Sequence, residues 1–90
     1  MFNSNYKELK PVFENCKAYY KKAHTYESKD GSKTLVSYST TVAKVIDGVA
    51  YRGHGAPQSA TTARHMREFF QQEGFDKMMM NDLRALPVFQ

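Results

Sequence analysis

The densest group of side chains able to do chemistry lies in one short stretch, where Arg64, His65 and Arg67 fall within about one helical turn. Two guanidinium groups and an imidazole at this spacing can hold a carboxylate or a phosphate, because arginine forms paired hydrogen bonds with both. The same side chains can equally bond to a neighbouring strand or loop and fix the helix to the rest of the fold. The sequence leaves both interpretations open, a binding site for an acidic partner and a structural anchor.

The side chains that most often carry catalysis are scattered along the chain. The three histidines are at least ten residues apart, and none pairs with a second ligand at the spacing of a metal site. His54 lies between two glycines, and the simpler interpretation is that it is a solvated residue of a loop. Cys16 falls on the apolar side of an expected helix and reads as a small core residue. We therefore expect no enzymatic activity, no metal and no cofactor.

A second possible binding surface comes from the stretch KAYYKKAHTY at residues 17–26, which interleaves basic and aromatic residues. Lysines can hold phosphates while tyrosines stack on bases, so the stretch suggests a nucleic-acid-binding module. Strand alternation separates the side chains, since Lys22 and Tyr26 share one face and Lys21 lies on the other. Over residues 19–26 the cations are therefore divided between two faces, with a single Lys on each.

The charge of the chain is unevenly distributed. Residues 1–52 hold nine Lys/Arg and five Asp/Glu, which accounts for the whole formal net charge of +4. This basic half, with Lys21, Lys22 and Lys44 among its cations, could bind an anionic partner. General solubility is the alternative explanation.

Length and composition bound the class of protein. The 90 residues predict a single domain over 1–90, and a hydrophobic fraction of 41% is enough for a thin core. With one cysteine there is no intrachain disulfide, which favours a reducing, cytoplasmic location. The chain has no apolar run long enough for a membrane span and no signal-peptide pattern at its start, so we expect no membrane association.

The expected elements begin with a helix and continue with a sheet. Helical spacing of apolar residues predicts a helix within 4–16, bent or broken near Lys10 because of the proline that follows it. Residues 18–27 and 33–46 are rich in strand formers, the second with a bend or bulge at 39–41. Asp47-Gly48 predicts a two-residue turn leading into a strand over 49–52.

The clearest expected helix spans 59–73, with Ser59 as its N-cap and Gly74 in the left-handed position that ends it. A short helix is expected around 78–85. Together these elements predict an α+β fold with a small three-stranded antiparallel sheet. Helices pack mainly on one face, in the order α-β-β-β-α with a short C-terminal helix.

Several blocks of the chain resemble a family of small uncharacterised proteins common in bacteriophages and mobile elements. The match is most specific in the helix block from Ser59 to Gly74, which reads SATTARHMREFFQQEG. It continues in the strand block SYSTTVA at 37–43, in the turn Asp47-Gly48, and in the ending LPV at 86–88. Glycine is expected where Lys21 or Lys22 stands, which is a departure from the pattern. The resemblance implies a compact accessory protein of phage type and carries over no activity.

Three functions follow as expectations. The first is a non-catalytic phage-type accessory protein that binds and inhibits or redirects a host protein or ribonucleoprotein complex, as an anti-CRISPR-like or other anti-defence inhibitor would. Its binding residues would be Arg64, His65 and Arg67, supported by Lys21, Lys22 and Lys44. The second is a nucleic-acid-binding module that uses the basic N-terminal half. The third is a structural component that works as a homo-oligomer through an exposed strand edge.

Overall fold

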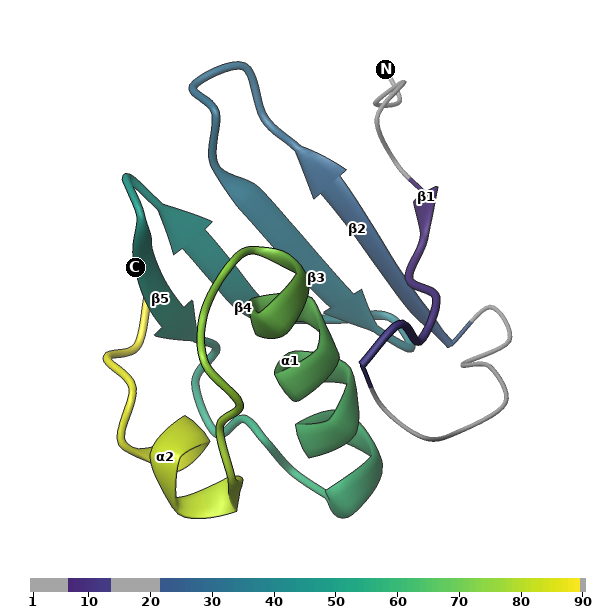
Figure 1. Ribbon diagram of the computed structural model, residues 1–90, viewed down its shortest axis with the longest axis vertical. Coiled ribbons are helices and arrows are strands. Elements are labelled where there is room, and N and C mark those ends of the chain that lie inside the picture. Colours follow the sequence, from purple (N-terminus) through teal and green to yellow (C-terminus); the bar gives the residue numbers. More distant parts are fainter. Residues whose placement is uncertain (1–6, 14–21, 90) are drawn as a thin grey trace.

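The computed structural model describes residues 7–13 and 22–89 and has an α+β architecture, with one antiparallel sheet and two helices (Figure 1). Its elements in chain order are β1 (Lys7–Glu8), β2 (Ala23–Glu27), β3 (Lys33–Ser37), β4 (Thr40–Ile46), β5 (Val49–Arg52), α1 (Ala60–Gln72) and α2 (Met80–Arg84). The strands lie in the order β1-β2-β3-β4-β5. α1 crosses one face of this sheet, and α2 lies beside α1 (Figure 1). Among the described residues, no helix has the length and apolar character that crossing a membrane requires.

The expected three-stranded sheet was wrong, because the sheet has five strands. One extra strand arises where residues 33–46 divide into β3 and β4 at Tyr38-Ser39, with Ser37 paired to Thr40 across the turn. Tyr38 has φ of 59°, which a tight hairpin turn requires and which a tyrosine rarely adopts. The β3–β4 register also shifts between Leu35 and Val36, which pair with Ala43 and Thr41. This irregularity lies beside Val42, and not at residues 39–41, where the bend or bulge was expected.

The other extra strand replaces the helix that was expected within 4–16. Of that range the structure describes residues 7–13, and Lys7 and Glu8 form β1 on the edge of β2. The amide of Leu9 then donates to the carbonyl of Ala23 at 2.9 Å, and Leu9 is 3% exposed. Pairing with β2 satisfies backbone groups that a helix broken by the proline at position 11 would leave unbonded.

Predictions that rest on local turn and cap chemistry are confirmed. Asp47 and Gly48 have φ of 51° and 77°, and the two-residue turn sets Val45 opposite Ala50. Ser59 caps α1, because its hydroxyl accepts a hydrogen bond from the amide of Thr62 at 3.2 Å.

The end of α1 is also as predicted. Gly74 has φ of 98°, and the amide of Phe75 donates to the carbonyl of Phe70 at 2.9 Å. The ring of Phe75 lies edge-on to that of Phe70, with centroids 5.8 Å apart. This contact directs the chain from α1 back toward the core.

The core lies between α1 and the sheet. Its largest members are Phe69 and Phe70 from α1 and Leu35 from β3, each at most 1% exposed. Burying side chains of this size stabilises the fold by about 2 to 3 kcal/mol each. Because α1 is held along its whole length, the polar side chains that it carries have fixed positions relative to the strands.

Candidate binding surface

A hydrogen bond between Ser37 and His65 joins the end of β3 to α1. The hydroxyl oxygen of Ser37 lies 2.8 Å from Nδ1 of His65, and the two residues are 3% and 0% exposed. Burial and, to a smaller extent, the positive charge of Lys22 together lower the pKa of His65 to about 4. His65 is therefore neutral near pH 7.

This Ser–His contact has the spacing of a nucleophile and its base. A nucleophile has to reach its substrate, however, and neither side chain has surface to present in this structure. The geometry therefore gives the pair a structural role: the hydrogen bond connects β3 to α1. This is one of the two interpretations that the sequence left open for His65.

Tyr38 follows Ser37 and is held at the surface in an unusual backbone conformation. Its amide donates to the carbonyl of Lys22 at 2.5 Å, and its ring centroid lies 6.1 Å from that of His65. The side chain is nonetheless 55% exposed. A positive φ in a bulky residue costs about 1 to 3 kcal/mol and persists only where the surroundings fix it. Here the hydrogen bond to Lys22 and the ring contact with His65 do so.

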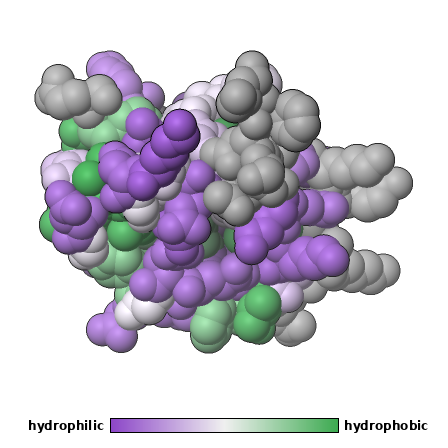
Figure 2. Space-filling view, turned by 90° about the horizontal axis from the view of Figure 1, so that it is seen from above, coloured by the Kyte–Doolittle hydropathy of each residue, from purple (hydrophilic) through white to green (hydrophobic). Residues whose placement is uncertain are grey.

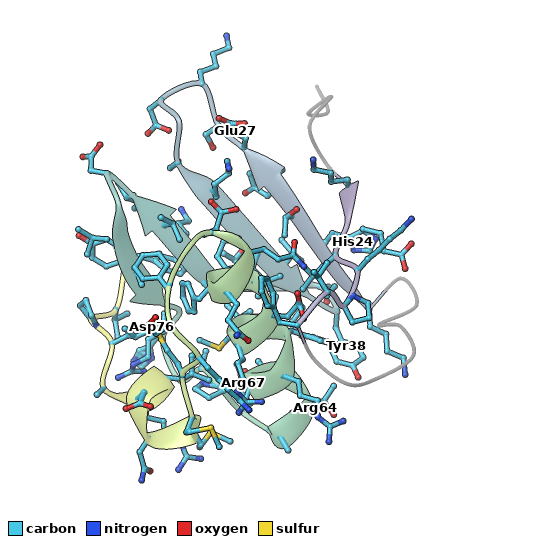
Figure 3. All side chains as sticks on the ribbon, in the orientation of Figure 1. His24, Glu27, Tyr38, Arg64, Arg67 and Asp76 are labelled. Atoms are coloured by element: carbon cyan, nitrogen blue, oxygen red, sulfur yellow. The ribbon has the colours of Figure 1, made fainter. Side chains whose placement is uncertain are left out.

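Two exposed cations adjoin the contacts that hold this tyrosine. Lys22 contributes the carbonyl that holds Tyr38, and Arg64 precedes His65 on α1, where it projects outward (Figure 3). We call Lys22, Tyr38 and Arg64, grouped around the buried His65, the Tyr38 surface. Tyr38 was missed by the sequence reasoning, although its block was recognised, because nothing in the sequence marks a tyrosine as a turn residue with positive φ.

The remaining predicted binding residues lie elsewhere. Arg67 is half-buried, and its Nε donates to the carbonyl of Met78 at 2.7 Å, which fixes the segment between α1 and α2. Lys44 lies in the middle of β4, with its ammonium 4.7 Å from the ring centroid of Phe89. Lys21 lies outside the described residues. The structure thus brings Lys22, Arg64 and His65 together and places Arg67 and Lys44 apart from them.

A buried carboxylate fixes the N-terminal segment to α1. Glu68 is 0% exposed, and its two oxygens accept hydrogen bonds from the amide of Phe13 at 2.9 and 3.2 Å. Gln72, one turn further along, donates to Glu68 at 2.6 Å and to the carbonyl of Lys10 at 2.8 Å. Charge-assisted bonds of this kind offset part of the cost of burying the charge.

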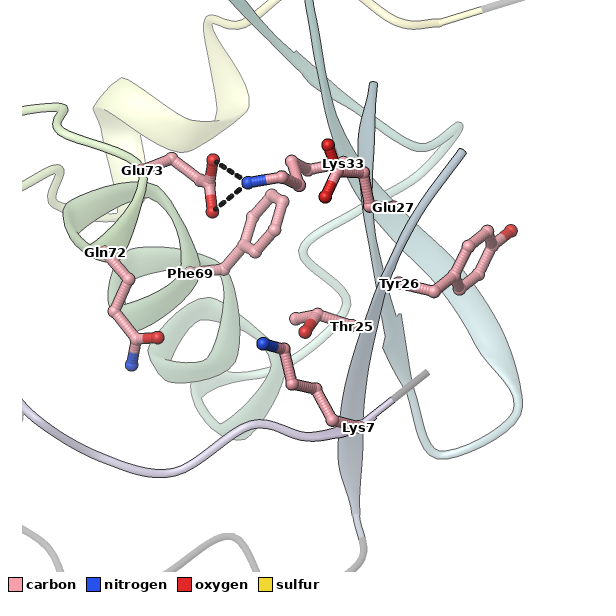
Figure 4. Close-up of a pocket in the computed structure, with 8 residues that line it drawn as sticks. All are labelled: Lys7, Thr25, Tyr26, Glu27, Lys33, Phe69, Gln72 and Glu73. Carbon is pink, nitrogen blue, oxygen red and sulfur yellow. Dashed lines mark hydrogen bonds and ion pairs between the residues drawn. The ribbon is translucent and has the colours of Figure 1, made fainter. Parts of the chain in front are cut away.

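A small cavity of about 180 Å³ lies between β1, β2 and α1 (Figure 4). Phe69 forms its apolar wall, Lys7 reaches into it, and Lys33 pairs with Glu73 across one side at 3.2 Å. Cations and carboxylates alternate around this cavity, so it offers no concentrated field of one sign to a ligand. Within residues 7–13 and 22–89, no group of three or more His, Cys, Asp or Glu side chains could hold a metal ion.

The fold and the Tyr38 surface define a small α+β protein with an exposed aromatic residue and two exposed cations grouped around a buried histidine. The chain belongs to DUF8033, a family of unknown function, which matches residues 7–84. No curated protein and no solved structure matches the chain.

Proposed function

We propose that this protein is a non-catalytic accessory protein of phage type that binds a host macromolecule through the Tyr38 surface and inhibits or redirects it. The phage-type origin is suggested by the resemblance of the helix block and the strand block described above. These two blocks meet in space at Ser37 and His65. An anti-defence role, against a host protein or a ribonucleoprotein complex in the host cytoplasm, suits such a protein.

The main support for the proposal is that Tyr38 is held in a fixed conformation with its side chain exposed. Tyrosine and arginine supply a large share of the binding energy at protein interfaces, and a preorganised side chain loses little entropy on binding. Tyr38 is fixed by Lys22 and His65 at the cost of backbone strain, yet over half of its surface remains exposed. Lys22 and Arg64 beside it favour a partner with acidic groups.

A capture experiment tests this proposal. Tagged protein is incubated with bacterial lysate, with and without nuclease, and bound proteins are identified by mass spectrometry. We expect a stoichiometric host protein that resists nuclease and is lost with Arg64→Glu. Arg84→Glu, which reverses an exposed arginine on α2, is the matched control and should keep the partner. Equal capture of the partner by both variants would exclude the Tyr38 surface as its binding site.

The same surface supports a second candidate, a nucleic-acid-binding module. An exposed tyrosine can stack on a base while Lys22 and Arg64 contact neighbouring phosphates. Affinity would then fall steeply with salt, because each neutralised phosphate releases bound counterions. Loss of all captured partners after nuclease treatment, together with such a salt dependence for a bare oligonucleotide, would favour this function over protein binding.

A further inference from the structure

The face of the sheet turned away from α1 carries a row of large side chains. Tyr26 points away from α1 (Figure 4). The strand register places Tyr26 opposite Thr34, Thr34 opposite Lys44, and Lys44 opposite Tyr51. Residues directly opposite each other in an antiparallel sheet share a face, so this row crosses four strands on the side away from the helix.

Apolar side chains extend the row toward the β4–β5 turn. Ile46 and Val49 are opposite each other and share the face of Lys44 by strand alternation. The ring of Phe89 lies under the ammonium of Lys44. We call this the outer face, defined by Tyr26, Lys44, Ile46, Val49, Tyr51 and Phe89.

Neither described helix packs over the outer face, since α1 and α2 both lie on the other side of the sheet (Figure 1). Thr34 is 1% exposed, although neither described helix lies over it, and Val49 at the end of the patch is 45% exposed. A sheet face of tyrosine, phenylalanine and β-branched residues with little charge has the composition of the centre of a protein interface.

The charges on and around the outer face indicate which kind of partner it can bind. Lys44 lies at the centre of the outer face, and Asp47 lies three residues further on, in the turn. Asp30 borders the same area: hydrogen bonds from Ser32 lower its pKa, with a smaller contribution from Lys44. The end of the molecule that carries the β2–β3 and β4–β5 turns is mainly hydrophilic (Figure 2). The carboxylates here would repel the phosphates of a nucleic acid. A surface that carries both signs of charge can instead pair with the same surface of a second copy.

We propose that the outer face binds a second copy of this chain, related by a two-fold axis that passes between Lys44 and Asp47. In this arrangement Tyr51, Val49 and Ile46 pack against the same residues of the second copy, and Lys44 of each copy faces Asp47 of the other. Such a contact is isologous and closes at two copies. It does not depend on the proposed function, because the Tyr38 surface lies at the opposite end of β3 and β4 and is left free.

Sedimentation equilibrium of the full chain, from roughly 1 μM to 1 mM, tests the proposal over the range of weak and transient dimers. We expect a dimer whose dissociation constant rises at least about tenfold in Val49→Asp, because a buried carboxylate without a partner opposes association. Met79→Asp is the matched control, since Met79 is an apolar residue at the N-cap of α2 with 56% exposure. It should dimerise like the parent. Thermal melting verifies that both variants are folded.

Cross-linking gives a second, independent measurement. A carbodiimide joins a lysine to a carboxylate in direct contact, and a mixture of ¹⁴N- and ¹⁵N-labelled chains separates links between copies from links within one. We expect a mixed-isotope link between Lys44 and Asp47. A monomer at every concentration, a dimer unaffected by Val49→Asp, or single-stranded oligonucleotide binding that Val49→Asp abolishes in a monomeric parent would each overturn the proposal.

Discussion

The hydroxyl of Ser37 and Nδ1 of His65 lie 2.8 Å apart inside the molecule, where the last residue of β3 meets the first half of α1. This contact fixes the positions of the residues on either side of it. Tyr38 follows Ser37 and Arg64 precedes His65, and both side chains are exposed. A pair of buried polar groups thus determines how two exposed side chains are presented.

Replacement of Ser37 by Ala should destabilise the fold. His65 Nδ1 would lose its hydroxyl partner in a buried setting, which costs about 1 to 3 kcal/mol. Urea unfolding measures the loss. Ser39→Ala, at an exposed position in the same turn, is the control and should change the unfolding free energy by less than about 0.5 kcal/mol. Equal stability of the two variants would show that the Ser37–His65 bond contributes nothing to the fold.

The stability of the protein should fall as the pH is lowered, and His65 should account for part of the fall. Its pKa is about 4 in the folded state, against an ordinary value of 6.5. The unfolded chain therefore binds more protons between these values, so the contribution is complete above pH 6.5 and is lost as the pH falls toward 4. The loss is of order 2 to 3 kcal/mol.

Urea unfolding from pH 4 to pH 7.5, for the parent chain and for His65→Gln, isolates this contribution. The variant carries no titrating imidazole at this position, so its stability should depend less on pH across the window. Curves of identical slope for both proteins would mean that His65 is protonated in the folded state as readily as in the unfolded state.

The carboxylate of Glu68 should protect the amide of Phe13 from hydrogen exchange. Glu68→Ala removes both acceptors of that amide, and the segment 10–13 should loosen. We expect faster exchange at Phe13 and a destabilisation of about 1 to 3 kcal/mol. Glu73→Ala, which breaks the ion pair with Lys33 and leaves Phe13 untouched, is the control. Unchanged protection of Phe13 in Glu68→Ala would contradict the anchoring role.

Gly53 should not tolerate a side chain. A Cβ at this position would lie 2.7 Å from the carbonyl oxygen of Thr41 and 3.3 Å from Cα of Val42, both backbone atoms that cannot turn aside. Gly53→Ala should therefore cost about 1 to 3 kcal/mol, since the β4–β5 pairing has to shift. Gly55→Ala is a useful comparison, because its Cβ would meet open space and only its φ of 80° opposes it. Melting temperatures that fall less for Gly53→Ala than for Gly55→Ala would contradict this ranking.

The parts of the fold that could be predicted are those with a local cause. The Asp47-Gly48 turn, the Ser59 cap and the Gly74 ending each depend on residues within a few positions of one another. The Tyr38 turn could not be predicted in this way. Its positive φ is maintained by Lys22 and His65, which are distant in sequence. The short β1 likewise depends on pairing with β2 across the segment 9–22.

The candidate site was predictable only in part, and for a related reason. Arg64 and His65 are adjacent in sequence, but neighbours on a helix point about 100° apart, so His65 enters the core while Arg64 remains outside. A polar residue on a helix is normally placed on the solvent side. The burial of His65 and Glu68 depends on partners, Ser37 and the amide of Phe13, that the periodicity of the helix does not show.

Tyr38→Gly separates the binding role of Tyr38 from its place in the fold. Glycine adopts positive φ without strain, which offsets the loss of the ring contact with His65 and the greater freedom of the unfolded chain. We therefore expect a change in unfolding free energy of no more than about 1 kcal/mol. Capture of the host partner should nonetheless drop at least about tenfold, as for an interface residue of central importance. If Tyr38→Gly keeps the partner while Arg64→Glu loses it, the binding contribution lies in the cation alone; if both keep it, the partner binds elsewhere on the molecule.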